Sequence, residues 1–370
     1  MPFMSRHAAS RMLAGTLPFL SLIAGLAQGP AALAGEMNIS QFVFRDVNRN
    51  GIYDRGEPPF AGITIRLEQE GRDPIRRQSN LAGFTNFPMS AEDAEKDITA
   101  PGPVTFAAEL PEGLILTTGN PMHSARIVAL PAAPGGLVME PVNPFMGVAS
   151  ALTITSRSEG IGAMTCSMGQ ITVAAQPRDG AFTCPVTPGE WTVVWDMADG
   201  TAPSRRVTVG DWPVHLPATA GETTGAKATR LSFDDLITSQ NILELPSFDG
   251  FLFHNFVVAH HKFYGGWGYV NGTVSGEFSA YNSSGHAARV ASDRPFGLDR
   301  VFVTAAWPQG AAHPVEFTAL RDGAVVATET VAVSNLAPVL FEPRWSGIDQ
   351  LVIRHAAYWQ VVLDDMELSR

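Results

Sequence analysis

Short runs of alternating apolar and polar residues recur along the chain, and turns rich in glycine and proline separate them. Clear examples are NISQFVF (38–44), ITIRL (63–67), WTVVWDM (191–197) and RVFVTAAW (300–307). Each fits the two-residue period of a β-strand that is buried on one face. No long stretch follows the period of an amphipathic helix. The pattern predicts an all-β protein made of tandem β-sandwiches.

The spacing of the predicted strands divides the chain into three segments, 36–142, 145–218 and 229–370. A polar stretch of small residues, PATAGETTGAKAT (217–229), is typical of a linker between the last two. A mature chain of about 335 residues exceeds what one ordinary hydrophobic core holds. We therefore expect three domains: an immunoglobulin-like or prealbumin-like sandwich, a small sandwich of the same kind, and a C-terminal jelly roll.

Residues 1–34 have the layout of a secretory signal peptide. Arg6 and Arg11 precede an apolar run at 13–27, and small residues, AALA, end at Ala34, after which we predict cleavage. No second apolar stretch is long enough to span a membrane, so we expect release into the periplasm or the medium. Loss of two arginines would change the formal net charge from -11 to -13, which disfavours a nucleic-acid partner.

The chain has two cysteines, Cys166 and Cys184, which lie close together in the second segment. Exported proteins are exposed to oxidising conditions, so we predict a disulfide between them. The alternative is a pair of reduced cysteines packed as small apolar side chains.

The most specific motif is FRDVNRNGIYDRGE, residues 44–57. Read from Asp46, oxygen-bearing groups fall at positions 1, 3, 5, 7, 9 and 12 of a loop: Asp46, Asn48, Asn50, the carbonyl of Ile52, Asp54 and Glu57. Calcium takes roughly six to eight oxygen ligands, and alternate side chains of a loop wrapped around it point inward. Gly51 allows the sharp turn, and we expect Arg45, Arg49 and Arg55 to point outward. The spacing predicts a Ca²⁺ site; the alternative is a solvated acidic hairpin.

Strands, not helices, are predicted on both sides of this loop, which disfavours a helix-loop-helix calcium sensor. The loop and the return strand AGITIRL (61–67), followed by NLAGFTNF (80–87), resemble the B-type repeats of serine-aspartate-repeat surface adhesins, the SdrD B-like domains. The resemblance implies a β-sandwich in which Asp46, Asn48, Asn50, Asp54 and Glu57 bind a structural calcium ion.

The third segment opens with TRLSFDDL and closes with YWQVVLDDMEL, two strands that end in paired aspartates. A jelly roll brings its first and last strands into one sheet, so Asp234, Asp235, Asp364 and Asp365 are expected to converge. Converging carboxylates repel each other unless a cation or protons intervene. A second calcium site is one interpretation, and solvated aspartates at strand ends are the other.

The order of short motifs between those strands is similar to that of a carbohydrate-binding-type jelly-roll module. Such a resemblance implies an aromatic surface, because the apolar faces of sugar rings stack on Trp and Tyr. The candidates in this glycine-rich sequence are Tyr264, Trp267, Tyr269, Tyr281 and Asn282. Phe251, Phe253 and Phe256 are expected in the core.

No HExxH, GxSxG or phosphate-binding glycine loop is present in the sequence. We therefore expect no enzyme, but a secreted, calcium-stabilised protein that acts in adhesion or binds a glycan or cell-envelope polymer. One alternative is a structural spacer of the extracellular matrix. Another is an extracellular hydrolase with its site on the jelly roll, because a glycosidase needs only two well-placed carboxylates.

Overall fold

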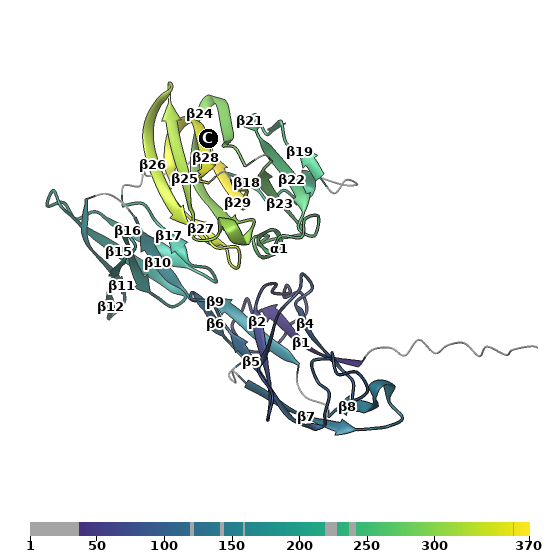
Figure 1. Ribbon diagram of the computed structural model, residues 1–370. Coiled ribbons are helices and arrows are strands. Elements are labelled where there is room, and N and C mark those ends of the chain that lie inside the picture. Colours follow the sequence, from purple (N-terminus) through teal and green to yellow (C-terminus); the bar gives the residue numbers. More distant parts are fainter. Residues whose placement is uncertain are drawn as a thin grey trace, which may run out of the picture. The chain divides into compact units, whose positions relative to one another are not determined.

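The computed structural model describes residues 37–118, 122–140, 144–157, 160–218, 228–236, 242–283, 285–357 and 359–370. The predicted signal peptide and residues 219–227 of the predicted linker lie outside these ranges. The described chain is nearly all β, which confirms the predicted fold class (Figure 1). Within the same ranges, no helix has the length and hydropathy that a membrane crossing needs.

Two sheets pack face to face in the first sandwich. Its strands are β1 (Met37–Arg45), β2 (Thr64–Gln69), β3 (Ile75–Gln78), β4 (Phe84–Met89), β5 (Gly102–Glu109), β6 (Leu114–Leu116), β7 (Met122–Ala129), β8 (Leu137–Met139) and β9 (Phe145–Ser150), with a 3₁₀ turn η1 (Pro134–Gly136). One sheet has the order β4-β1-β9-β6 and the other β3-β2-β5-β7-β8. Ile39 and Val43 of β1 point into the shared core, as their alternation predicts.

Strand β9 lies in the first sandwich, although the sequence placed residues 145–150 in the second segment. It pairs in parallel with β1 and antiparallel with β6. The sequence signal was ambiguous because MGVASALTITS is continuously apolar and small, with no turn residue after Gly147. The core of the second sandwich begins at Leu152.

A small core that includes both cysteines holds the second sandwich together. Its strands are β10 (Thr153–Ser156), β11 (Ile161–Met168), β12 (Ile171–Ala174), β13 (Gln176–Arg178), β14 (Ala181–Pro185), β15 (Gly189–Met197), β16 (Ser204–Val209) and β17 (Val214–His215). Cys166 of β11 and Cys184 of β14 form a disulfide, which confirms the prediction. Because β11 and β14 belong to different sheets, the bond fastens one sheet to the other.

The third sandwich contains the largest core. Its elements are β18 (Ala228–Leu231), η2 (Asp234–Leu236), β19 (Ile242–Glu244), β20 (Ser247–Phe248), β21 (Phe251–His254), β22 (Phe256–His260), α1 (Trp267–Asn271), β23 (Phe278–Asn282), β24 (Ala288–Ala305), η3 (Pro308–Gly310), β25 (Pro314–Arg321), β26 (Ala324–Ala332), β27 (Val339–Phe341), β28 (Trp345–His355) and β29 (Val361–Ser369). The first strand, β18, pairs antiparallel with the last, β29, as expected for a jelly roll. Phe251, Phe253 and Phe256 are buried in the core, as predicted.

A short strand joins the second sandwich to the third. Strand β17 pairs in parallel with β10 on one side and with β27 on the other, so hydrogen bonding runs from one sandwich into the next. His215 at the end of β17 also bonds to the Glu329 carboxylate of β26, with 2.9 Å between Nε2 and Oε1 and both side chains buried. The two sandwiches therefore share backbone pairing and a buried polar contact.

Arg45 also makes contacts across segments, which corrects the expectation that it points outward. Its side chain is buried, its guanidinium donates to the carbonyl of Asn271 at 2.8 Å, and it lies over the rings of Phe60 and Trp212. Burial lowers the pKa of Arg45 to about 9. Arg45 is the last residue of β1, so its side chain follows the pleat of the strand and not the loop.

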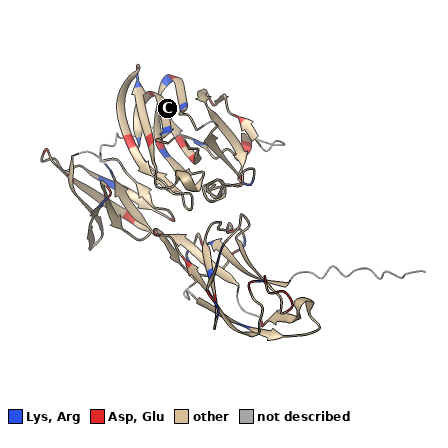
Figure 2. Ribbon diagram, in the orientation of Figure 1, with Lys and Arg blue, Asp and Glu red and all other residues tan. Residues whose placement is uncertain are grey.

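Charged residues of both signs occur on all three sandwiches (Figure 2).

Candidate functional site

The acidic loop at residues 46–57 follows β1 directly, and its predicted ligand residues are tied together by short-range hydrogen bonds. Asp46 accepts hydrogen bonds from the backbone N–H groups of Asn50 (3.2 Å) and Gly51 (2.8 Å). The Asp54 carboxylate accepts one from each amide of Asn48 and Asn50, both at 2.7 Å. These bonds fold the first half of the loop over its second half.

Glu57 closes the loop from its far end. Its two carboxylate oxygens accept the backbone N–H groups of Val47 (3.0 Å) and Asp54 (2.9 Å). Ile52 donates its backbone N–H to the Asn50 side chain at 2.8 Å, while its own side chain is exposed. Gly51 has φ +75°, and a Cβ there would lie 2.7 Å from the carbonyl oxygen of Thr117, so this position requires glycine.

Aromatic packing holds the loop against the outer face of the first sheet. The Tyr53 ring lies edge-on to Phe42 and Phe44, each at 5.2 Å, and stacks on Phe145 at 5.4 Å. These partners come from β1 and β9, whose side chains at these positions point away from the core shared by the sheets. Tyr53, which lies inside the loop, therefore anchors the loop to the sheet.

The electrostatics of the loop reflect the closeness of its carboxylates. Burial raises the pKa of Glu57, and the charges of Asp46 and Asp54 act in the same direction. Hydrogen bonds from Asn48 and Asn50 lower the pKa of Asp54. The loop thus gathers acidic groups whose mutual repulsion a cation would relieve.

The donor set suits a hard cation, since it consists of carboxylate and amide oxygens. In the described residues, however, no group of three or more acidic, histidine or cysteine side chains is close enough to form a metal centre. Calcium binding at this loop stays a prediction. Of the two other arginines, Arg55 is exposed, whereas Arg49 reaches back to donate to the carbonyls of Ser150 and Asp211.

The paired aspartates of the third sandwich converge on one loop, residues 274–278. Asp364 is fully buried and accepts backbone N–H groups of this loop at 2.6 and 3.1 Å. Asp234 accepts two others, at 2.8 and 3.2 Å. Asp365 forms a two-point ion pair with Arg230, at 3.0 and 2.6 Å, whereas Asp235 is exposed.

These contacts show how the chain itself stabilises the carboxylates. Burial raises the pKa of Asp364 well above its usual range, and the neighbouring Asp365 adds to the shift. Backbone N–H groups oppose it, and Arg230 neutralises Asp365. The four aspartates are not gathered into a metal centre in the described residues. Asp364 and Asp365 fasten residues 274–275 to β29, and Asp234 fastens residues 277–278 to η2.

The aromatic residues predicted to contact a ligand lie mostly inside the third sandwich. Tyr269 and Tyr281 are each 1% exposed, and Asn282 is 2% exposed. The Tyr269 hydroxyl donates to Gln360 at 2.7 Å, and the hydroxyls of Tyr264 and Tyr281 bond to each other at 2.7 Å. Buried rings whose hydroxyls are already paired do not present a face on which a sugar can stack.

Trp267 and Asn282 have structural partners as well. Trp267 begins α1, and its ring packs so closely over Gly62 of the first sandwich that a Cβ on Gly62 would lie 2.5 Å from it. Asn282 bonds to the carbonyl of His286 at 2.9 Å and to the N–H of Val361 at 2.7 Å. The half-buried Tyr264 retains the most accessible ring of the candidate tyrosines.

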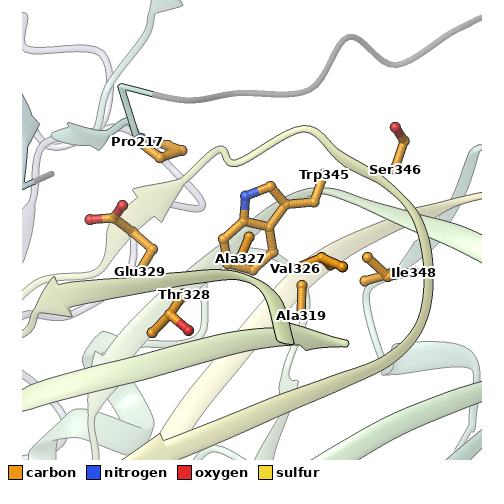
Figure 3. Close-up of a pocket in the computed structure, with 9 residues that line it drawn as sticks. All are labelled: Pro217, Ala319, Val326, Ala327, Thr328, Glu329, Trp345, Ser346 and Ile348. Atoms are coloured by element: carbon orange, nitrogen blue, oxygen red, sulfur yellow. The ribbon is translucent and has the colours of Figure 1, made fainter. Parts of the chain in front are cut away.

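A pocket of ≈ 280 Å³ lies elsewhere on the third sandwich, at strands β25, β26 and β28 (Figure 3). Its lining is Pro217, Ala319, Val326, Ala327, Thr328, Glu329, Trp345, Ser346 and Ile348. In Figure 3 the indole of Trp345 lies at the centre of these side chains, with Glu329 and Ser346 on either side. Pro217 comes from the end of the second sandwich, so both sandwiches build the pocket.

The polar groups of this pocket differ in their exposure to solvent. Glu329 is 5% exposed and is held by His215, whereas the hydroxyl-bearing Thr328 and Ser346 are exposed. Among the described residues, the Nε1 donor of Trp345 makes no hydrogen bond, and it is open to solvent. The arrangement combines an aromatic ring, an open N–H donor, two hydroxyls and one carboxylate.

Sequence reasoning missed this pocket. Trp345 begins the strand WSGIDQLVIRH, and Glu329 lies in a strand of otherwise apolar and threonine residues, with no local motif around either. Pro217, which contributes to the lining, follows β17, and β17 pairs with β27 more than a hundred positions away along the chain. No signal in the sequence around these residues marks the site.

No protein-family model matches the chain, and no curated protein matches it. Solved structures with similarity include the CBM51-2 (in complex with GlcNAc) and INT domains of ZmpB from Clostridium perfringens (14% identity, TM-score 0.23, 59% of this chain and 46% of that one). Another is the shaft pilin SpaA of Lactobacillus rhamnosus GG (11% identity, TM-score 0.24, 49% of this chain and 96% of that one). A third is an exo-β-1,3-galactanase of Phanerochaete chrysosporium (8% identity, TM-score 0.27, 85% of this chain and 69% of that one). The chain spans less than half of the first structure, and TM-scores this low carry no argument about function.

Proposed function

We propose that the chain is an extracellular, non-catalytic binding protein that holds one sugar unit of a glycan or cell-envelope polymer in the pocket around Trp345. The observation that carries this proposal is the indole of Trp345, whose N–H is open to solvent in a partly apolar pocket that Glu329, Thr328 and Ser346 also line. Sugar sites need this combination, because a pyranose has both an apolar face and a ring of hydroxyls.

The size of the pocket favours a single sugar ring. Its volume of ≈ 280 Å³ is just under the roughly 300–1,000 Å³ that is typical of small-molecule sites. The lining contains one carboxylate, that of Glu329, whereas hydrolysis of a glycosidic bond uses a pair. This difference supports binding over the alternative of a hydrolase.

We further propose that calcium at residues 46–57 stiffens the first sandwich. Asp46, Asp54 and Glu57 would supply carboxylate oxygens and Asn48 and Asn50 amide oxygens, with the Ile52 carbonyl as a further ligand. The ion would favour the ionised form of Glu57, whose pKa is raised first by burial and then by the charges of Asp46 and Asp54. Its role is to order the strand connection, and it takes no part in binding the sugar.

A structural spacer is the second candidate. It is favoured by the continuous pairing through β17 and by the buried contacts of Arg45 with residues of all three segments. A spacer needs such joints, because its length is useful only if its domains do not bend. Self-association of the purified chain without any glycan binding would favour this candidate.

A pair of neighbouring valines provides the test of the binder. Val326 lines the pocket, and Val325, next to it on β26, does not; both are exposed, at 54% and 61%. We expect the mature chain to be retained on a glycan array or an insoluble cell-envelope polymer. Val326→Arg should abolish retention by filling the pocket, while Val325→Arg should keep it. Equal retention of the two variants would contradict the proposed site.

A further inference from the structure

We propose that the pocket around Trp345 selects an amino sugar, a hexose ring that carries a free ammonium group, over a neutral sugar. This inference rests on the proposed function, because it names the ligand class of the same site.

The lining of the pocket carries one charge. Glu329 is the single charged residue among the nine that line the pocket, and it is 5% exposed. A carboxylate in such a partly desolvated place is stabilised by a cation or by charge-assisted hydrogen bonds. One oxygen, Oε1, already bonds to His215, and no hydrogen bond to Oε2 occurs among the described residues. An ammonium group would supply the missing partner.

The indole offers a second attraction for a cation. Trp345 lines the same pocket, and aromatic rings attract cations through their electron-rich faces. A cation between Trp345 and Glu329 would therefore be favoured from two sides. The indole Nε1–H and the hydroxyls of Thr328 and Ser346 remain for the sugar oxygens.

The charge of the whole chain acts in the same direction. Its formal net charge is -11, so cationic polymers are attracted to it over a distance and neutral ones are not. Long-range attraction raises the local concentration of a polymer of amino sugars, while the pocket selects one unit of it. Both effects weaken with added salt.

His215 fixes the geometry of this site from the neighbouring sandwich. Its bond to Glu329 crosses from β17 to β26, and Pro217 of the same segment forms part of the rim. The complete mature chain, and not the third segment alone, is therefore the correct material for a test.

The test compares three oligosaccharides of equal length by titration calorimetry: a tetramer of glucosamine, its fully N-acetylated form, and the neutral cellotetraose. We expect glucosamine to bind at least about 10-fold tighter than the other two at low salt. Glu329→Gln keeps the shape of the side chain and an oxygen for His215 but removes the charge. It should reduce glucosamine binding to the level of cellotetraose.

Each result has a separate meaning. If cellotetraose or the acetylated tetramer binds as tightly as glucosamine and Glu329→Gln has no effect, the amino-sugar inference is overturned and the glycan-binding proposal stands. If none of the three binds, both are overturned. Tri-lysine carries the same ammonium chemistry without a sugar ring; if it binds as tightly as the glucosamine tetramer, the ligand is a cation and not an amino sugar. Glu190→Gln, an exposed change on the second sandwich, serves as the charge control.

Discussion

The predicted ligand residues of the acidic loop in the first sandwich and the aromatic stretch of the third, residues 264–282, differ in how far their hydrogen bonds reach along the chain. Loop hydrogen bonds such as Val47 to Glu57 and Ile52 to Asn50 join residues 10 and 2 positions apart. In the aromatic stretch, Tyr264 meets Tyr281 after 17 positions, and Tyr269 meets Gln360 after 91. A local pattern encodes the first kind of geometry, whereas only the folded sandwich creates the second.

The largest expected effect is a loss of stability on substitution in the aromatic stretch, which tests whether this stretch is packed as tightly as the structure shows. A Cβ on Gly268 would lie 1.8 Å from the carbonyl oxygen of Ala305, whereas a Cβ on Gly265, in the same stretch, meets nothing within 4 Å. Gly268→Ala should cost about 3 kcal/mol of unfolding free energy by overpacking, and Gly265→Ala about 0.5 kcal/mol or less. Urea unfolding followed by tryptophan fluorescence measures both. Equal stability of the two variants would mean that this stretch is loose and exposed.

The next effect concerns the loop and its proposed ion. Calcium at about 100 times its dissociation constant should add about 2.7 kcal/mol of stability to the mature chain. Chelation should remove this gain, and Asp46→Asn should abolish the response to calcium. Asp73→Asn, an exposed change on the same sandwich, should leave it intact. A melting temperature that does not respond to chelator would remove the calcium proposal and leave a loop held by its own hydrogen bonds.

A smaller effect follows from the raised pKa of Glu57. In the calcium-free chain this group binds its proton more tightly when folded, so its contribution favours folding at low pH and is lost as the pH rises through the raised pKa. Calcium needs the ionised carboxylate, so the stabilisation by calcium should shrink as the pH falls, beginning at a higher pH than for an ordinary glutamate. Melting temperatures with and without calcium between about pH 7 and about pH 5 measure this. A constant difference across that range would show that Glu57 does not bind the ion.

The same distinction explains what the sequence could and could not predict. Strand alternation predicted β1, β2 and β15, and among the residues that the spacing of 46–57 selects, Asn48 and Asn50 both hydrogen-bond to Asp54. Arg45 was misjudged because its partners, Asn271 and Trp212, lie in other segments. Glycines around Trp267 suggested an exposed loop, but Gly268 serves close approach to the backbone of Ala305.

The most direct measurement of the central claim follows the indole N–H signals of the mature chain by nuclear magnetic resonance during titration with the oligosaccharide that binds best. Trp345→Phe identifies the signal of the pocket, and Trp267→Phe identifies that of the aromatic stretch. We predict that the Trp345 signal moves with ligand concentration and that the Trp267 signal does not. Movement of the Trp267 signal with a stationary Trp345 signal would contradict the account.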